Sequence, residues 1–148
     1  MFISSRVSSR EDLEDVLLGS DFIVNCTDNP SVQETTKILD GYAQRLQIPY
    51  CVSGGYNIPL GMVGPIIVPG KTKSFEDFMA FQKSSDSLSH LRIVKDIEQS
   101  GNLGPIAGAV ANMQVMEIFK YLTGKGKLNL NHFYEVDFLN QELYERDW

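Results

Sequence analysis

The chain has 148 residues, of which 43% are hydrophobic and 22% charged, so it is long enough for about one domain with a hydrophobic core. Its 13 Lys and Arg residues against 19 Asp and Glu residues give a net charge of −6, which argues against broad electrostatic binding to nucleic acid or anionic lipid. The sequence has no signal-peptide pattern and no run of about 18 uncharged apolar residues, so we expect a soluble cytoplasmic protein without membrane contact.

The first third of the chain alternates between predicted helices and strands. A capping-box pattern predicts a short helix over residues 8–18. Residues 22–26 form an apolar run that predicts a strand covered on both faces. A helix is expected from Pro30 to about Leu46, followed by a buried strand over residues 48–52. Strand, helix and strand in this order predict a parallel crossover unit.

The middle of the chain is less regular. Residues 62–68 are strand-like but contain Gly64 and Pro65, which predicts an edge or bulged position. Residues 71–100 are polar and partly helical. The strong apolar anchors of that segment are Phe75, Phe78, Met79 and Phe81.

The last third shows two clear periodicities. An apolar stripe with helical spacing predicts a long helix over residues 104–122, ended by Gly124. Residues 128–138 alternate between apolar and polar, which predicts a half-buried antiparallel strand. Residues 141–148 can return as another strand. Together these elements predict an α/β fold: a Rossmann-like mixed sheet with helices, parallel in its first part and antiparallel later.

The two cysteines, Cys26 and Cys51, both lie in apolar strand-like runs and lack the spacing of metal ligands. This pattern predicts two buried thiols in a reducing compartment and no zinc site.

Asp28 is the main candidate for a functional side chain, because it directly follows the strand predicted at residues 22–26. Ligands of open α/β sheets bind beyond the carboxyl ends of the strands, where an acid can hold a metal-bound phosphate or a ribose. The alternative is that Asp28 or Asn29 only caps the next helix, with Pro30 in its first turn. The residue types alone leave both interpretations open.

Three segments carry a resemblance to a known family. They are Asp21-Phe-Ile-Val-Asn-Cys-Thr-Asp-Asn29, then Pro49-Tyr-Cys-Val-Ser-Gly-Gly55 with Gly61-Met-Val-Gly64, and then the helix from Gly104-Pro-Ile-Ala-Gly to Thr123-Gly124. In this order and spacing they resemble the carboxyl-terminal half of the ThiF/MoeB/HesA family, bacterial relatives of ubiquitin-activating enzymes.

The resemblance implies an adenylyltransferase that uses ATP and magnesium to activate a carboxylate. The carboxylate would be the carboxyl terminus of a ubiquitin-like sulfur carrier or of a peptide. Asp28 matches the magnesium-binding acid of the family, and Thr27 and Asn29 would shape the same nucleotide-binding loop.

The resemblance also implies a homodimer, formed through the 104–122 helix and the 62–68 region. Met113, Met116 and Phe119 on this helix are therefore predicted to lie in the core or in a dimer seam, not around a cofactor.

Several features of the family are absent from the sequence. It has no Gly-x-Gly-x-x-Gly turn, no acid placed for the ribose, and no Arg and Lys set for the phosphates. The zinc-binding Cys-x-x-Cys pairs and the transfer cysteine also have no counterpart, and Asn25 stands where many members have an acid. We therefore expect residues 1–148 to be a single partial domain that lacks the amino-terminal nucleotide-binding half and holds no catalytic residue.

Three interpretations of function follow. The chain is a fragment of an adenylyltransferase, inactive by itself, or a non-catalytic module for dimerisation or protein binding. The third, the distal half of a nicotinamide-dependent dehydrogenase, predicts a hydride-handling residue that the sequence does not show.

Four further polar or aromatic residues have structural interpretations. His90 and His132 have no partner at ligand or triad spacing and are predicted to be structural or solvent-facing. Tyr56 and Asn57 are predicted to serve a turn, although they could also line a peptide-binding crevice.

Overall fold

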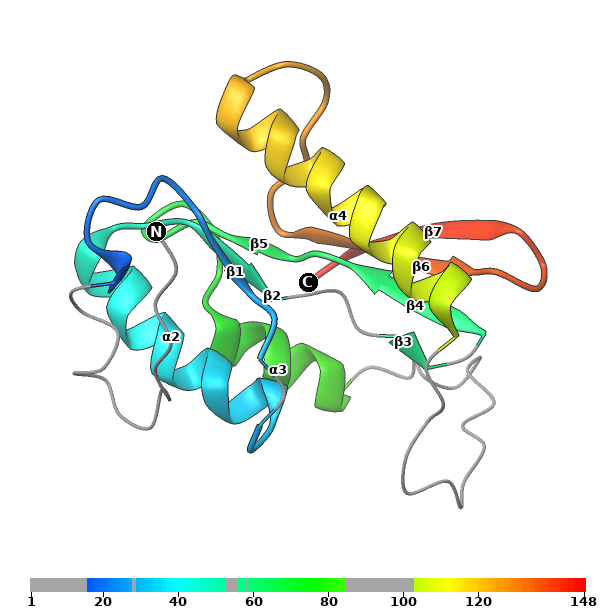
Figure 1. Cartoon of the computed structure of the whole chain (residues 1–148), viewed down its shortest axis with the longest axis horizontal. Coiled ribbons are helices and arrows are strands. Elements are labelled where there is room, and N and C mark those ends of the chain that lie inside the picture. Colours follow the sequence, from blue (N-terminus) through cyan, green and yellow to red (C-terminus); the bar gives the residue numbers. More distant parts are fainter. Residues whose placement is uncertain (1–15, 28, 53–55, 58, 85–102) are drawn as a thin grey trace.

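The computed structural model describes residues 16–27, 29–52, 56–57, 59–84 and 103–148. Within these ranges two β-sheets pack with helices on both sides (Figure 1). The elements, in chain order, are β1 (Ile23–Asn25), α2 (Val32–Leu46), β2 (Tyr50–Val52), β3 (Tyr56–Asn57), β4 (Leu60–Val63), β5 (Ile66–Ile67), α3 (Phe75–Ser84), α4 (Gly104–Thr123), β6 (His132–Asp137) and β7 (Glu142–Asp147).

The first sheet has the strand order β1-β2-β5. β1 and β2 are parallel, with Asn25 opposite Val52, and helix α2 connects them. β5 pairs antiparallel with β2. This confirms the predicted parallel crossover unit, and it brings the carboxyl ends of β1 and β2 to the same edge of the sheet.

The second sheet is entirely antiparallel and has the order β3-β4-β6-β7. It confirms the predicted change from parallel to antiparallel pairing along the chain. The strands divide between two sheets, with β5 beside the parallel strands and β3, β4, β6 and β7 in the second sheet. The alternating segment predicted at 128–138 is a strand only over His132–Asp137, and the tail returns as β7.

Residues 62–68 explain the division into two sheets. The chain leaves β4 at Gly64, whose φ of +85° favours glycine, and enters β5 after Pro65. The buried side chain of Gln114 on α4 accepts a hydrogen bond from the Gly64 backbone N–H at 2.6 Å and so fixes this crossing. Residues 63–68 are buried within the protomer, so our expectation that the 62–68 region forms dimer contacts is wrong for these residues.

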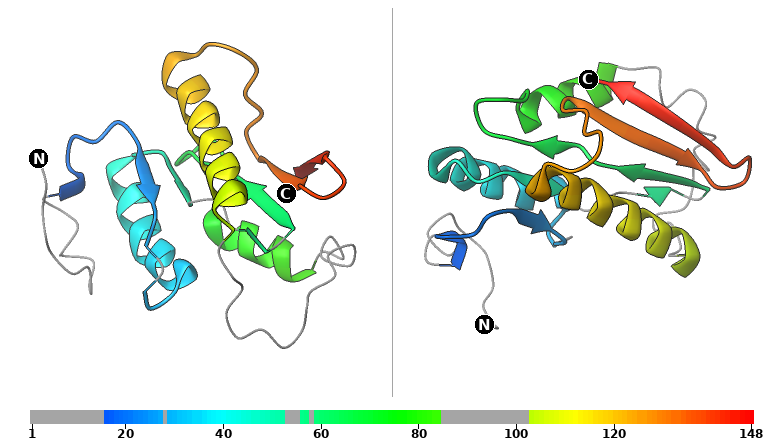
Figure 2. Two further views of the ribbon diagram at one scale, coloured as in Figure 1. Left: turned by 45° about the vertical axis from the view of Figure 1, so that its right-hand side comes forward. Right: turned by 90° about the horizontal axis from the view of Figure 1, so that it is seen from above.

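The helices lie on opposite sides of the sheets: α2 and α3 on one side and α4 on the other (Figures 1 and 2). The core beneath α2 and α3 contains most of the large buried side chains, with Phe78 packed edge-to-face against Phe133 and Trp148. On the other side Val63, Ile106 and Val110 form a separate core between α4 and the second sheet. The described helices include none that is long and apolar enough to cross a membrane.

Helix α2 follows from its sequence pattern. Its buried face contains Leu39, Tyr42 and Ala43 at helical spacing. Gln47 ends the helix in the left-handed conformation, and its N–H bonds to the carbonyl of Ala43. On this side of the sheet the Tyr50 hydroxyl donates to Asp40 Oδ1 at 2.8 Å, which ties β2 to α2.

The remaining predicted helices are partly observed. Of the helix predicted at 8–18, the described part begins at Val16, and residues 16 and 17 are helical. α3 accounts for the apolar anchors of the 71–100 segment, of which residues 85–100 lie outside the described part of the chain together with His90. α4 matches the predicted long helix and ends at Gly124, as expected.

Candidate functional site

The turn after β1 is the candidate site, since it follows the carboxyl end of a strand in the parallel part of the fold. Thr27 and Asn29 are both exposed, so a hydroxyl and an amide are available to a ligand. Asp28, the predicted magnesium-binding residue, lies outside the described residues.

Asn25, the last residue of β1, anchors this turn to helix α2. Its side chain is 6% exposed, and its Oδ1 accepts hydrogen bonds from the Thr27 N–H at 3.1 Å and the Thr27 hydroxyl at 2.5 Å. Its Nδ2 donates to the hydroxyls of Thr35 at 3.2 Å and Thr36 at 2.9 Å. The amide oxygen and the amide nitrogen of Asn25 thus both have hydrogen-bond partners, the oxygen in the turn and the nitrogen in the helix.

The two threonines are themselves fixed to the helix. Thr36 donates its hydroxyl to the Val32 carbonyl at 2.6 Å, and Thr35 lies 3.0 Å from the Ser31 carbonyl oxygen. Because Asn25 Oδ1 is occupied by Thr27, it is not free to act as a second metal ligand.

The capping alternative for Asp28 and Asn29 is wrong, because Ser31 is the N-cap of α2. Its side chain accepts a hydrogen bond from the Glu34 N–H at 3.2 Å. The helix begins at Val32, so Pro30 precedes it and does not occupy its first turn as we expected. The turn between Thr27 and Ser31 is therefore not needed to cap the helix.

The two cysteines differ, contrary to the expectation that both are buried. Cys51 in β2 is fully buried, whereas Cys26 directly after β1 is exposed. Burial, reinforced by the neighbouring Cys26, raises the pKa of the Cys51 thiol to about 12, while the Gln114 side chain acts in the opposite direction. Cys26 is exposed because α2 covers only the opposite face of β1, and Val24 is 45% exposed for the same reason.

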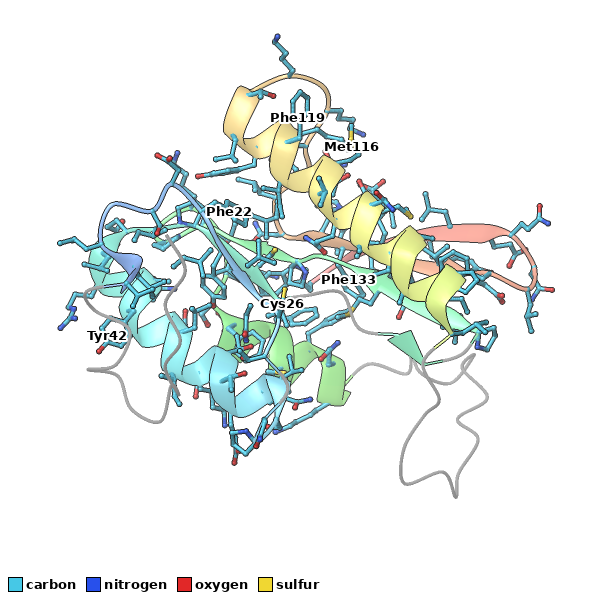
Figure 3. The ribbon with its side chains drawn as sticks, in the orientation of Figure 1. Phe22, Cys26, Tyr42, Met116, Phe119 and Phe133 are labelled. Carbon is cyan, nitrogen blue, oxygen red and sulfur yellow. The ribbon has the colours of Figure 1, made fainter. Side chains whose placement is uncertain are left out.

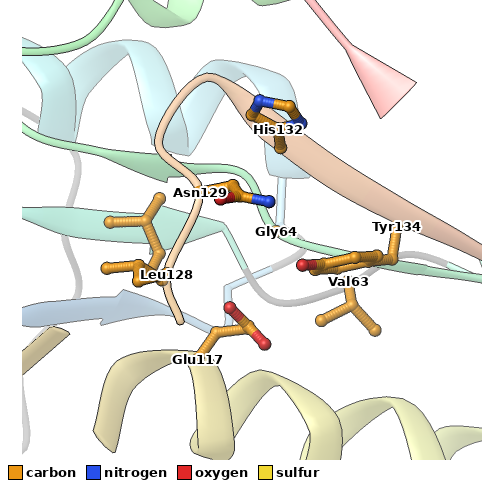
Figure 4. Close-up of a pocket in the computed structure, with 8 residues that line it drawn as sticks. Val63, Gly64, Glu117, Leu128, Asn129, His132 and Tyr134 are labelled. Atoms are coloured by element: carbon orange, nitrogen blue, oxygen red, sulfur yellow. The ribbon is translucent and has the colours of Figure 1, made fainter. Parts of the chain in front are cut away.

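A small pocket lies between α4 and the β6 region, with room for about one water molecule (Figure 4). Glu117 and Tyr134 line it, and Glu117 is paired with Lys120 at 2.5 Å. Burial, and then the charges of Glu117 and Glu145, raise the pKa of the Tyr134 hydroxyl. Among the described residues of the turn after β1, none lines this pocket.

His132 also lines this pocket, and its Nδ1 lies 2.7 Å from Asp147 Oδ1 and 3.3 Å from Glu145 Oε1. These contacts connect β6 with β7, in keeping with a structural role. Tyr56 and Asn57 form the short strand β3, so the turn predicted for them is wrong.

The donor atoms at the turn suit a hard cation. Hydroxyl, amide and carboxylate oxygens are the ligands that magnesium accepts, often together with phosphate oxygens. In the described part of the chain, no three His, Cys, Asp or Glu side chains come close enough to hold a metal by themselves. A cation at this turn would thus depend on Asp28 and on oxygen atoms supplied by a nucleotide.

Comparison with known proteins decides the family. The sequence profile described as the ThiF family matches residues 3–147. The chain belongs to the ThiF family. This match confirms the family resemblance carried by the 21–29, 49–64 and 104–124 segments. Among curated protein sequences, none matches this ThiF-family chain significantly.

Solved structures show the same fold. The chain is similar to Escherichia coli MccB with ATP, at 20% identity and a TM-score of 0.72, over 98% of this chain and 41% of MccB. It is also similar to selenomethionine-labelled PaaA, at 21% identity and a TM-score of 0.66, over 95% of this chain and 46% of PaaA. A structure of the microcin C7 biosynthetic enzyme MccB with N-formylated MccA matches at 20% identity and a TM-score of 0.72, over 98% of this chain and 43% of that one. This ThiF-family chain thus spans less than half of the chains that it matches.

Sequence reasoning missed the hydrogen-bond network of Asn25 with Thr35 and Thr36. Two signals pointed to it: an asparagine within an apolar strand, and adjacent threonines in the apolar stripe of the next helix. Buried polar side chains need partners, and these were the polar groups available to one another.

Proposed function

We propose that residues 1–148 form one partial domain, equivalent to the carboxyl-terminal half of a cytoplasmic adenylyltransferase, and that this half is inactive by itself. The complete enzyme would use ATP and magnesium to activate the terminal carboxylate of a polypeptide. The observation that carries the proposal is the ThiF-family match over nearly the whole chain, combined with coverage of only 41% of the MccB chain.

The turn after β1 would contribute the metal-binding part of the site. In this proposal Asp28 binds magnesium, while Thr27 and Asn29 contact the nucleotide or the hydration shell of the metal. Magnesium would neutralise the triphosphate and help pyrophosphate leave. The exposed side chains of Thr27 and Asn29 support this assignment, since both remain accessible beside Asp28 in the sequence.

The carboxylate substrate would belong to a peptide or to a ubiquitin-like carrier. A polypeptide partner is supported by the structures of MccB with MccA. For this chain, the site that would receive the polypeptide needs the rest of the enzyme, because the groups that bind the phosphates are absent from its sequence.

ATP–pyrophosphate exchange tests the claim that the site is incomplete. We expect no exchange above background when the purified chain is incubated with ATP, magnesium and candidate carboxylate peptides. If the parent does show exchange, an Asp28→Asn variant decides whether that activity depends on the turn after β1. Exchange by the parent chain alone would show that residues 1–148 already contain a working site.

The codons upstream of Met1 give a second test. The fragment proposal predicts a strand and a glycine-rich phosphate loop encoded in frame before Met1. A ribosome-binding site directly before Met1 would instead favour the second candidate function.

The second candidate function is a non-catalytic module for dimerisation or protein binding. One observation favours it: α4 exposes Val115, Met116, Phe119 and Leu122. Its charged residues, Glu117 and Lys120, pair with each other. In both candidate functions we propose that this apolar row, marked by Met116 and Phe119 in Figure 3, contacts a second copy of the chain.

A further inference from the structure

We propose that Asn25 is the positioning residue of the turn after β1, and that the hydroxyl of Thr36 holds Asn25 in place. Asn25 does not touch the metal or the nucleotide in this proposal. It fixes the orientation of Thr27, and with it the start of the turn that contains Asp28. The inference rests on the proposed function for its chemical meaning, but the contacts that carry it are independent of that function.

The first argument is the double use of the Asn25 amide. Its oxygen accepts two hydrogen bonds from Thr27, and its nitrogen donates to two threonines of α2. One side chain thereby joins the end of a strand, the start of a turn and the first turns of a helix. An aspartate could keep the bonds from Thr27, but in its ionised form it has no hydrogen to donate to Thr35 and Thr36.

The second argument is burial. Asn25 is 6% exposed and Thr36 is fully buried, whereas Thr27 is exposed. The network therefore has a fixed, water-excluded end at the helix and an accessible end at the turn. Buried hydrogen bonds hold geometry better than exposed ones because water does not compete for the partners.

The third argument is that Asn25 resembles the residues that orient metal ligands in other proteins without touching the metal. Side chains that orient a metal ligand typically change metal affinity by 10–100-fold when they are lost, although they do not contact the metal. Asn25 is placed to have this effect, since Thr27 directly precedes the predicted metal ligand in the sequence.

A matched pair of substitutions at Thr36 tests the proposal without altering the turn. Thr36→Val keeps the side-chain shape but removes the hydroxyl, while Thr36→Ser keeps the hydroxyl. We expect hydrogen exchange of the Thr27 backbone N–H, measured by NMR, to become several-fold faster in Thr36→Val and to stay near the parent rate in Thr36→Ser. Asn112→Ala is the control, because Asn112 is exposed and its side chain donates to the Gly108 carbonyl within α4.

Asn25→Ala should accelerate Thr27 exchange more than Thr36→Val does, because it removes the acceptor of the Thr27 N–H itself. Thermal unfolding of each variant separates this local effect from a general loss of stability. Equal Thr27 exchange rates in the Val and Ser variants would overturn the proposal, as would an unchanged rate in a folded Asn25→Ala chain.

Manganese serves as the probe of the metal. Titration of Mn²⁺ into the labelled parent chain with ATP should broaden the amide signals of Thr27 and Asn29. The Mn²⁺ concentration needed should rise by about tenfold in Thr36→Val but not in Thr36→Ser. Broadening that is equal in both variants would overturn the positioning role. Absence of broadening in the parent would show that the turn does not hold a metal without the phosphate-binding half of the enzyme, and the exchange rates would then decide the role of Asn25.

Discussion

At the scale of single residues, two buried side chains at the carboxyl ends of β1 and β2 have opposite chemical characters. Asn25 has a polar partner for both its donor and its acceptor. Cys51 is fully buried, and its thiol is held in the neutral form by burial. Their neighbour Cys26 is exposed. This difference between the cysteines gives a direct test of how the sheet is covered.

We predict that Ellman's reagent at pH 8 modifies Cys26 rapidly and leaves Cys51 unmodified in the folded chain. A pKa raised to about 12 leaves Cys51 overwhelmingly protonated at this pH, and the thiolate is the reactive species. Cys51 should react only after unfolding in guanidinium chloride. The measurement is the number and rate of released thionitrobenzoate equivalents.

Cys26→Ser is the control for this experiment and should remove the rapid phase completely. Two rapid phases in the parent chain would contradict the burial of Cys51.

The raised pKa of Cys51 also predicts how the free energy of unfolding changes with pH. Above the ordinary thiol pKa, Cys51 ionises in the unfolded chain but not in the folded chain. This contribution to stability is therefore present at neutral pH and lost as the pH rises above about 9.

At the scale of elements, the close contact between α4 and β4 depends on Gly61. A Cβ atom added there would clash with Val110 of α4 and would lie 2.9 Å from Phe138 Cε2. Neither neighbour can move freely, since Val110 is 2% exposed and belongs to the core under α4. The absence of a side chain at this position therefore sets how near the helix lies to the strand.

We predict that Gly61→Ala lowers the free energy of unfolding by about 1–3 kcal/mol, the usual cost of overpacking a core. Denaturant unfolding followed by circular dichroism measures this change.

Gly108→Ala, in helix α4, is the matched control for Gly61→Ala. Gly108 has no heavy atom within 4 Å of the added Cβ, so Ala should raise stability by roughly 0.5–1 kcal/mol through its better helix propensity. A loss of stability in Gly108→Ala equal to that in Gly61→Ala would show that the contact with β4 is not the cause.

At the scale of the whole molecule, the most notable surface feature of the described residues is an apolar row on the solvent-facing side of α4. Four large apolar side chains on it are 48–59% exposed: Val115, Met116, Phe119 and Leu122. Contiguous exposed apolar surface of this kind marks interaction sites in soluble proteins. A second copy could cover the row through a twofold axis, which requires no other molecule.

We predict that the parent chain is a dimer at micromolar concentration. Phe119→Lys should raise the dissociation constant of the dimer by about tenfold or more, as expected for loss of a central aromatic contact. Sedimentation velocity over a concentration series measures the dissociation constant. The added charge would have to be buried at the twofold contact, which is unfavourable without a partner.

Leu139→Lys is the matched control, because Leu139 is 76% exposed but lies between β6 and β7 and is not part of the apolar row on α4. It should leave the dimer unchanged. A parent chain that sediments as a monomer at these concentrations would contradict the proposed contact, and equal weakening by both variants would place the contact elsewhere.

Much of the fold could be predicted from local patterns. The parallel unit over β1, α2 and β2, the long α4 helix and the strand β6 all appear within the segments where periodicity or capping indicated them. The division into two sheets could not be predicted, because it depends on the crossing at Gly64, which Gln114 holds from 50 positions along the chain. Local patterns contain no information about such a distant partner.

The candidate site was predictable in position but not in its internal contacts. A carboxyl end of a strand followed by Thr27, Asp28 and Asn29 indicated a ligand-binding turn. The identity of the cap was not predictable, since several residues of the turn are suitable and only the helix start at Val32 selects Ser31. The exposure of Cys26 likewise depended on which elements cover each face of β1.

The sequence by itself determined the family, the alternation of helices and strands and the place of the candidate turn, because these follow from short-range residue patterns. Only the tertiary structure decided that Asn25 joins the turn to α2, that Cys26 is exposed and that α4 presents an uncovered apolar row. The physical reason is that burial and hydrogen-bond pairing depend on which distant segments pack together, and the chain order alone does not specify those neighbours.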